Sequence, residues 1–257
     1  MRGRSKKSGF LYARIAKIGY AEDFIPAGKR KVWPEPSLAA AFGPDPPMPI
    51  VFAYPGGVKQ YQAECEQRCP YQPESCPECA TSGRLVKHGV YWRKPRDGER
   101  VYRIAIHRWR CQACRRTVSA LPDFLLRFRW YLLAVVSEVV VARAEEGTSW
   151  SGLAAAAQDA PVVRTMQRWW MSFGAQALRW LAAIQAVLAQ QDSASPWLDP
   201  RGEAVRVSGS AQALLGAAGH LLAWAKSRWV ELAPYGWKDR LRFAWLWGSQ
   251  QGLGRLI

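Results

Sequence analysis

Two Cys-x-x-Cys motifs constrain the fold of this chain more than any other feature. They are Cys76-Pro77-Glu78-Cys79 and Cys111-Gln112-Ala113-Cys114, and 31 residues separate them. Each motif turns tightly enough for both of its sulfurs to face one metal ion, and four thiolates complete a tetrahedral coordination sphere. Because no position is left for water, such a site stabilises structure and carries no chemistry. The alternative, a pair of disulfides, is typical of secreted domains, and we identify no secretory signal in the sequence.

The residues between the motifs predict a β-hairpin. Residues 85–92 and 101–106 contain the β-branched and aromatic residues typical of strands, and residues 95–98 form a turn between them. Two Cys-x-x-Cys motifs around a hairpin are the plan of a zinc ribbon, so we expect a structural Zn²⁺. Its expected ligands are Cys76, Cys79, Cys111 and Cys114.

A second pair of cysteines, Cys65 and Cys69, precedes the first motif. No further Cys pair completes a second metal site around it. The other potential ligands nearby are His88 and His107. The pair is either half of a second site or two free thiols, and free thiols are the default expectation.

Positive charge is concentrated in the predicted hairpin. The chain of 257 residues has a formal net charge of +16, and residues 84–116 contain eleven Lys or Arg against two acids. Positive charges this close together repel one another unless a polyanion binds to them, and nucleic acid is the natural polyanion. The alternative is a basic surface that is merely solvated. The candidate nucleic-acid contacts in this region are Arg93, Lys94, Arg96, Arg100, Arg103, Arg108, Arg110, Arg115 and Arg116.

Composition divides the chain into four parts. Residues 1–47 form a basic, Pro-rich arm that we expect to be poorly ordered. The arm either adds phosphate contacts or results from a start codon assigned too far upstream. Residues 48–128 form the zinc ribbon, with a short strand at 50–54, a helix at 58–66 and an apolar loop at 120–126. Residues 129–192 form a helical region. Residues 193–257 form a C-terminal helical and aromatic segment, expected to pack on the helices or on a second subunit.

The helical region predicts a helix-turn-helix. Apolar residues at a spacing of three and four give residues 129–146 one buried stripe, formed by Leu132, Val135, Val136, Val139 and Val140. A short helix capped by Thr148 or Ser149 follows at 150–158, and a third helix spans 162–173 with Pro161 before it. Further helices are expected at 174–191 and at 211–229. The apolar stripe expected for the first of them consists of Leu178, Leu181, Ile184 and Leu188.

The third helix would contact base edges if the unit binds DNA, whereas many three-helix units serve packing alone. Arg and Gln are the side chains that bond guanine and adenine bidentately in the major groove. The candidate contacts are Arg164, Thr165, Gln167 and Arg168.

Several segments resemble a bacterial domain-of-unknown-function family that carries a transposase-type zinc ribbon followed by a helix-turn-helix. The resemblance covers residues 48–175 and rests on the two Cys motifs, His88-Gly89-Val90-Tyr91, Asp97-Gly98-Glu99 and Leu121-Pro122-Asp123-Phe124-Leu125. It implies a transposase-like, mobile-element protein that binds double-stranded DNA. A transposase subunit or a second copy of the chain is a further expected partner. The alternatives are a protein-interaction module and a transcriptional regulator associated with a mobile element.

The expected fold class is therefore α+β, a small β-hairpin zinc ribbon followed by a mainly α-helical helix-turn-helix region. We expect a cytoplasmic protein without a membrane span, because the longest apolar stretch, 130–142, is short and contains Glu138. We expect no enzyme, because nuclease chemistry needs gathered carboxylates. The acids after residue 175 fall in loops or at helix ends: Asp192, Asp199, Glu203, Glu231 and Asp239.

Overall fold

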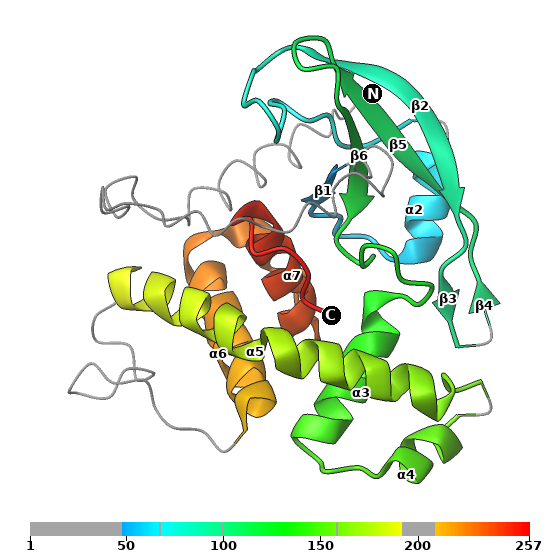
Figure 1. Ribbon diagram of the computed structural model, residues 1–257, viewed down its shortest axis with the longest axis vertical. Coiled ribbons are helices and arrows are strands. Elements are labelled where there is room, and N and C mark those ends of the chain that lie inside the picture. The colour runs from blue at the N-terminus through cyan, green and yellow to red at the C-terminus, as the bar shows by residue number, and fades with distance from the viewer. Residues whose placement is uncertain (1–47, 67, 99, 158, 192–208) are drawn as a thin grey trace, which may run out of the picture.

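The computed structural model has a mixed α+β architecture, with a small sheet followed by a group of helices (Figure 1). It describes residues 48–66, 68–98, 100–157, 159–191 and 209–257. The predicted N-terminal arm and the predicted boundary at 192/193 lie outside these residues. The α+β class expected from the sequence is confirmed.

A four-stranded sheet forms the first half of the fold. Its order is β1-β6-β5-β2, with β1 parallel to β6 and the other neighbours antiparallel. Helix α2 (Val58–Cys65) packs on one face, where the Tyr61 hydroxyl donates to the Ala105 carbonyl at 3.1 Å. The strands are β1 (Met48–Phe52), β2 (Leu85–Arg93), β5 (Ile104–Cys111) and β6 (Thr117–Pro122).

Strand β6 corrects one expectation, since residues 120–126 were predicted to form an apolar loop. The run is apolar because its first part is a strand between β1 and β5, with Ala120 and Leu121 buried. A strand that is buried on both faces is a continuous apolar run without alternating polar residues. The sequence pattern therefore did not identify this run as a strand.

The predicted β-hairpin is present as β2 and β5, and it is longer than expected. Its second strand begins at Ile104 and continues to Cys111, so it carries the first cysteine of the second motif. The tip forms a separate two-stranded sheet of β3 (Arg96–Asp97) and β4 (Arg100–Val101). The Arg96 amide donates to Trp130 at 2.6 Å, and the Leu132 amide donates to Arg96 at 2.9 Å. The tip is therefore fixed to the chain just before the helices.

The second half of the fold is helical, as the sequence predicts. The predicted stripe of its first helix, α3, is buried throughout. Ser149, one of the two predicted caps, accepts the Gly152 amide at 3.0 Å. The elements are α3 (Leu133–Ala144), α4 (Trp150–Ala155), α5 (Val163–Gln191), α6 (Ser210–Arg228), η2 (Val230–Leu232), η3 (Trp237–Asp239) and α7 (Arg240–Gln250).

Helix α5 corrects a second expectation. The helices predicted at 162–173 and 174–191 are one continuous helix of 29 residues, and it begins at Val163, so Pro161 precedes it. Gly174 costs about 1 kcal/mol relative to Ala in a helix interior. The buried side chains continue across it, from Met166, Trp169 and Phe173 to Ala177 and Trp180. This packing outweighs the cost of the glycine.

The buried stripe of the second half of α5 also differs from the prediction. Ile184 and Leu188 are buried as expected, but Leu178 is 69% exposed and Leu181 is half-buried. Trp180 takes the predicted place of Leu181 in the core, with its Nε1 donating to the Arg255 carbonyl at 3.1 Å.

The aromatic C-terminal segment packs within the chain. Phe243, Trp245 and Trp247 of α7 are buried, and the Trp245 indole donates to the Leu125 carbonyl at 3.0 Å. The Arg240 guanidinium donates to both carboxylate oxygens of Glu145, each at 2.8 Å. These contacts attach α7 to the end of the sheet and to the C-terminus of α3.

A fully buried carboxylate, Asp123, joins the sheet to the C-terminal segment. It follows β6, and its Oδ1 accepts the Tyr54 amide at 3.3 Å and the Arg242 guanidinium at 2.8 Å. Its Oδ2 accepts the Tyr235 hydroxyl, and Arg242 also donates to the Tyr54 carbonyl. Burial raises the pKa of the Asp123 carboxyl, and the charge of Arg242 opposes that shift.

We expect Gly248→Ala to destabilise the protein and Gly174→Ala to stabilise it. A Cβ at Gly248 would lie 2.1 Å from the buried Trp180 ring, whereas a Cβ at Gly174 meets nothing within 4 Å. The first change should therefore cost about 1–3 kcal/mol of unfolding free energy. The second should add about 1 kcal/mol. Urea denaturation followed by Trp fluorescence measures both, and equal effects of the two substitutions would contradict the packing described.

We expect Arg242→Met to reduce the unfolding free energy by about 3–5 kcal/mol, because it leaves a buried carboxylate without its cation. The exposed neighbour Lys238 supplies the control, since Lys238→Met should change stability by less than about 0.5 kcal/mol. The folded pKa of Asp123 is raised, so its protonation favours the folded state of the variant as pH falls. The variant should therefore regain stability between neutral and mildly acidic pH. A loss that stays constant over this range would argue against the ion pair.

Candidate metal centre and basic surfaces

The two Cys-x-x-Cys motifs adopt the same backbone conformation. In the first, the Ala80 amide donates to the Cys76 carbonyl at 2.8 Å and the Cys76 amide to the Thr81 carbonyl at 3.1 Å. In the second, the Arg115 amide donates to the Cys111 carbonyl at 3.0 Å and the Cys111 amide to the Arg116 carbonyl at 2.9 Å. Each motif is thus a closed turn with both cysteine side chains on its inner side.

The residue after each motif takes a left-handed conformation although it is not glycine. Ala80 has φ 55° and Arg115 has φ 63°. Non-glycine residues adopt this conformation uncommonly, and it costs of order 1–3 kcal/mol where tertiary contacts maintain it. The same uncommon turn at both motifs indicates that each is shaped to present its two sulfurs.

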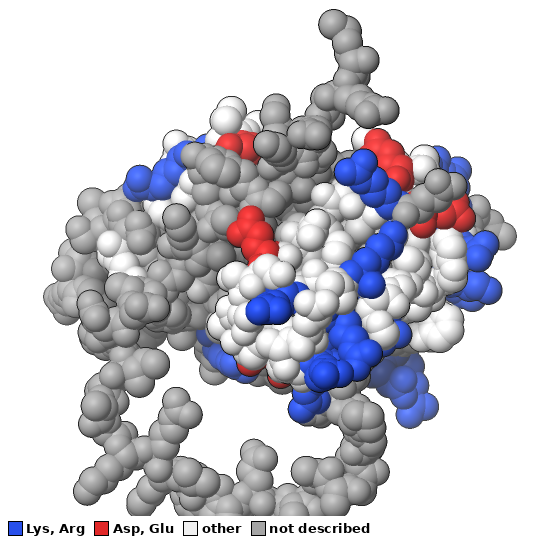
Figure 2. Space-filling model, turned by 90° about the horizontal axis from the view of Figure 1, so that it is seen from above, with Lys and Arg blue, Asp and Glu red and all other residues white. Residues whose placement is uncertain are grey.

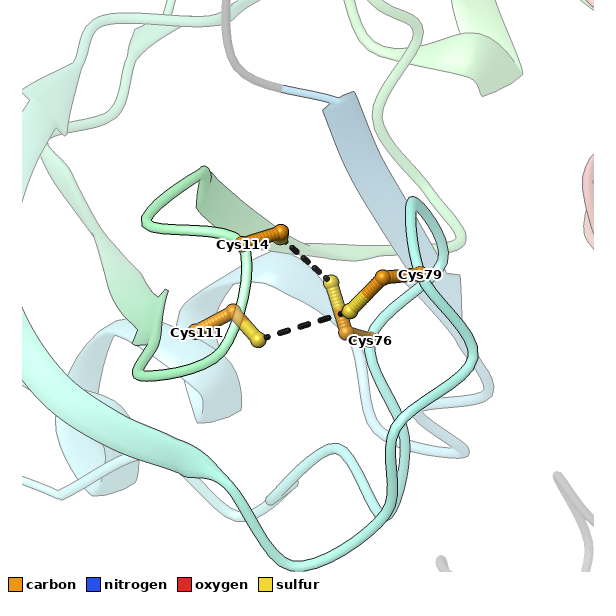
Figure 3. A group of neighbouring side chains, drawn as sticks. All are labelled: Cys76, Cys79, Cys111 and Cys114. Atoms are coloured by element: carbon orange, nitrogen blue, oxygen red, sulfur yellow. Dashed lines mark hydrogen bonds between the residues drawn. The ribbon is translucent and has the colours of Figure 1, made fainter.

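The four sulfur atoms converge between the two turns (Figure 3). The Sγ atoms of Cys76 and Cys114 are 3.7 Å apart, as are those of Cys79 and Cys111. All four lie within 4.8 Å of one another. A Zn–S bond of about 2.3 Å places the sulfurs of a tetrahedral site about 3.8 Å apart. A disulfide would require about 2.05 Å. The spacing fits four thiolates around one metal ion.

Burial and hydrogen bonding differ among the four thiols. Cys76 and Cys111 are buried, Cys114 is half-buried and Cys79 is exposed. Hydrogen bonds from the side chain and backbone of Thr81 lower the pKa of Cys79 to about 6. Burial raises the pKa of Cys76. Because the thiolate is the metal-binding form, Cys79 is the cysteine most readily available to a metal ion.

The second cysteine pair does not gather further ligands in the part of the chain that the structure describes. There, the four-cysteine cluster is the one group of three or more His, Cys, Asp or Glu with ligand atoms this close together. His107 is buried, and its Nε2 lies 2.9 Å from the Cys65 carbonyl. Burial raises the pKa values of Cys65 and Cys69 to about 12 and about 11. These values favour two free, protonated thiols.

Most of the predicted nucleic-acid contacts of the hairpin lie on the surface. Figure 2 looks down on the end of the molecule where β2 and β5 lie, and Lys and Arg form several groups there with fewer acids between them. Arg108 is half-buried. The exposed members are Lys94, Arg96, Arg100, Arg103, Arg110, Arg115 and Arg116. The Arg103 guanidinium stacks on Trp92, with its Cζ 3.9 Å from the ring centroid.

Arg93 differs from the other predicted contacts. Its guanidinium donates to the Leu126 carbonyl at 3.0 Å and also to the Arg129 carbonyl. Burial lowers its pKa. Arg93 therefore holds β2 against the chain that follows β6, a role that the sequence did not indicate.

The predicted contacts on α5 occupy its first two turns. Arg164 and Arg168 are exposed one helical turn apart, and Thr165 and Gln167 are half-buried. Helix α4 packs beside this half of α5 (Figure 1). A groove of about 720 Å³ is lined mainly by α3, together with Asp97 and Gly98 of the hairpin tip and Asp159 and Pro161 before α5. The hairpin tip and the turn before α5 thus line the same groove, but Arg164 and Arg168 are not among its lining residues.

The acids considered for catalysis do not all fall within the described residues. Asp192, Asp199 and Glu203 lie outside them. Asp239 accepts the Gly236 amide at 2.8 Å and caps the 3-10 helix η3. In the part of the chain described, every helix is too short or too polar to cross a membrane.

The comparisons with known proteins support the resemblance over part of its range and assign no activity. Residues 76–169 match a family model described as a domain of unknown function (DUF6431). The match begins at the first cysteine of the cluster and ends within α5, so resemblance to a family of unknown function is confirmed for these residues. No curated protein and no solved structure matches the chain.

We expect Cys111→Ser to abolish high-affinity metal binding and to unfold the region from 76 to 114. Cys111 is fully buried and supplies one of four converging sulfurs, so its loss opens the site. Metal content is measured by atomic emission after purification in zinc, and folding by hydrogen exchange of β2 and β5. Cys69→Ser is the matched control, since Cys69 lies outside the cluster. Full metal content with unchanged protection in the Cys111 variant would contradict the site.

Proposed function

We propose that the chain is a zinc-dependent DNA-binding protein of the transposon type, without a nuclease domain of its own. The observation that carries the proposal is the tetrahedral spacing of four thiols at the base of an arginine-rich hairpin. The transposon type and a bacterial origin rest on the family resemblance of residues 48–175. A transcriptional regulator associated with a mobile element would use the same surfaces.

In this proposal zinc holds the base of the hairpin closed. The two motifs meet at their sulfurs, with Cys76 and Cys114 and likewise Cys79 and Cys111 at an Sγ–Sγ distance of 3.7 Å. A structural zinc site of this kind contributes about 10 kcal/mol or more to folding. Cys76, Cys79, Cys111 and Cys114 would supply all four ligands, so the ion would have no open position for substrate.

The exposed hairpin arginines would bind backbone phosphates. Such contacts fix the position of a protein on a duplex without distinguishing base sequence. Arg100 at the tip and Arg110 near the cysteine cluster are both exposed, so the basic surface extends along the hairpin. Binding through this surface would release counterions and weaken as salt rises.

Sequence discrimination would come from the first turns of α5. Arg164 and Arg168 are exposed on one face, and Arg is suited to bidentate contact with guanine. The hairpin tip and the turn before α5 line the same groove, so these two segments lie near each other. This supports simultaneous contact of both surfaces with one duplex, while the acids lining the groove would keep phosphates at its rim.

A second candidate function is a protein-interaction module, which docks on a transposase subunit or on a second copy of the chain. Met171 and Leu178 are 71% and 69% exposed, and they lie on the same face of α5 as Arg164 and Arg168. Exposed apolar side chains at this spacing are typical of helix docking surfaces. The two functions predict different effects of salt on affinity. Binding to phosphates should weaken as salt rises, whereas apolar docking should be insensitive to salt.

We expect two arginine pairs to affect DNA binding differently. Arg100→Ala with Arg110→Ala should weaken binding to every duplex, and should reduce the slope of log affinity against log salt by about 2, because each phosphate contact contributes about 0.9. Arg164→Ala with Arg168→Ala should mainly reduce preference for the sequences selected from a random library, by about 1–3 kcal/mol per lost base contact. Fluorescence anisotropy over a salt series measures both.

Arg179→Ala is the control, because Arg179 is exposed on α5 outside the proposed contacts. Equal losses on all sequences from the α5 pair would assign Arg164 and Arg168 to phosphates. Absence of duplex binding at low salt would refute the DNA-binding function. Self-association or subunit binding that is insensitive to salt and abolished by Met171→Ser with Leu178→Ser would then support the second candidate.

A further inference from the structure

A pocket on the sheet face opposite α2 has the composition of an anion site. Its volume is about 380 Å³, near the lower end of the range of about 300–1,000 Å³ typical of small-ligand sites. Pro49, Ser119 and Arg108 are consecutive partners across β1, β6 and β5, so they form one row across the sheet at this pocket. Strand pairing therefore builds one wall of the pocket, and the segment between β6 and α3 supplies Arg127 and Phe128.

Two polar atoms of this row have no hydrogen-bond partner among the residues that the structure describes. Ser119 is only 2% exposed, and its hydroxyl is one of these two atoms. The Nε of Arg108 is likewise buried without a partner. Buried polar groups are nearly always hydrogen-bonded, so two such atoms that line a pocket are available to bond a ligand placed there. Here the available groups are a guanidinium donor and a hydroxyl.

Charge around the pocket is of one sign. Arg93, Arg108 and Arg127 line it, and none of the lining residues that the structure describes is acidic. Burial and the nearby charge of Arg255 lower the pKa of the neighbouring Arg129. An anion in the pocket would neutralise part of the positive charge of the arginines that line it.

An aromatic ring completes the pocket. Phe128 is 57% exposed and has φ 58°, a conformation that bulky residues rarely adopt and that is often found at binding sites. Its ring is flanked by the guanidinium carbons of Arg127 at 4.8 Å and Arg255 at 5.6 Å. Exposed aromatic rings beside arginines are the platforms on which unpaired bases stack.

We propose that this pocket binds one unpaired nucleotide of a DNA strand, with Arg108, Arg127 and Ser119 on its phosphate and Phe128 stacked on its base. The inference rests on the proposed DNA-binding function for the identity of the strand. It assigns the pocket a role distinct from the hairpin and α5 surfaces, which would contact duplex.

The test compares a blunt duplex with the same duplex carrying a short single-stranded overhang. Wild-type protein should bind the overhang duplex about tenfold more tightly, the gain expected from one stacked base with its phosphate. Arg108→Gln and Phe128→Gly should each remove most of this gain while leaving the affinity for the blunt duplex nearly unchanged. Glycine suits the positive φ of position 128, so the second variant deletes the ring without adding strain.

Arg100→Gln is the control, since Arg100 is exposed at the hairpin tip and should lower binding to both duplexes equally. Metal content and melting temperature confirm that each variant is folded. Equal affinity of wild-type protein for both duplexes would overturn the pocket assignment and leave the proposed function intact. Suppose that the protein binds thymidine monophosphate through Arg108 but binds neither duplex. This result would overturn the proposed DNA-binding function and, with it, the assignment of a DNA strand to the pocket. A pocket variant that weakens both duplexes equally would also overturn the assignment.

Discussion

The buried carboxylate of Asp123 is the interaction on which the arrangement of the whole chain depends. It accepts hydrogen bonds from Tyr54 after β1, from Tyr235 before η3 and from Arg242 in α7. Its own amide donates to Phe52 at 3.0 Å. One side chain therefore joins the parallel strand pair to a segment more than a hundred residues later. A charge buried this deeply is tolerated because each of its oxygens accepts a hydrogen bond.

The cysteine cluster brings distant segments together at the opposite end of the sheet. It joins the turn that precedes β2 to the turn between β5 and β6. Both motifs use the same hydrogen-bonded turn, and a left-handed Ala80 or Arg115 ends each one. Between the two ends, β2 and β5 are held at the tip by Arg96 and along one side by Arg93. The basic hairpin thus contacts other segments of the chain at its base, at its tip and along its length.

The sequence predicts those features that depend on local spacing. Three features are recognised by a fixed spacing of residues along the chain, and the structure contains all of them. They are the cysteine motifs, the hairpin between them and the buried stripe of α3. The end of the third helix was predicted wrongly because Gly174 is a local helix breaker, whereas the packing of Trp180 that overrides it involves Arg255.

The features that the sequence does not predict are set by distant partners. Nothing near Asp123 indicates that Arg242 neutralises it, and nothing near Arg93 indicates that two carbonyls occupy its guanidinium. The pocket at Ser119 and Arg108 likewise depends on the pairing of three strands from separate parts of the chain. Charge composition identified the basic region as a whole, but it does not distinguish an arginine that faces solvent from one that closes the structure.

The continuity of α5 has a mechanical consequence. The helix that exposes Arg164 and Arg168 is the same continuous helix that brings Trp180 into contact with Arg255. A displacement of the first turns of α5 is therefore coupled, through one uninterrupted helix, to the packing around Trp180 and the C-terminal segment.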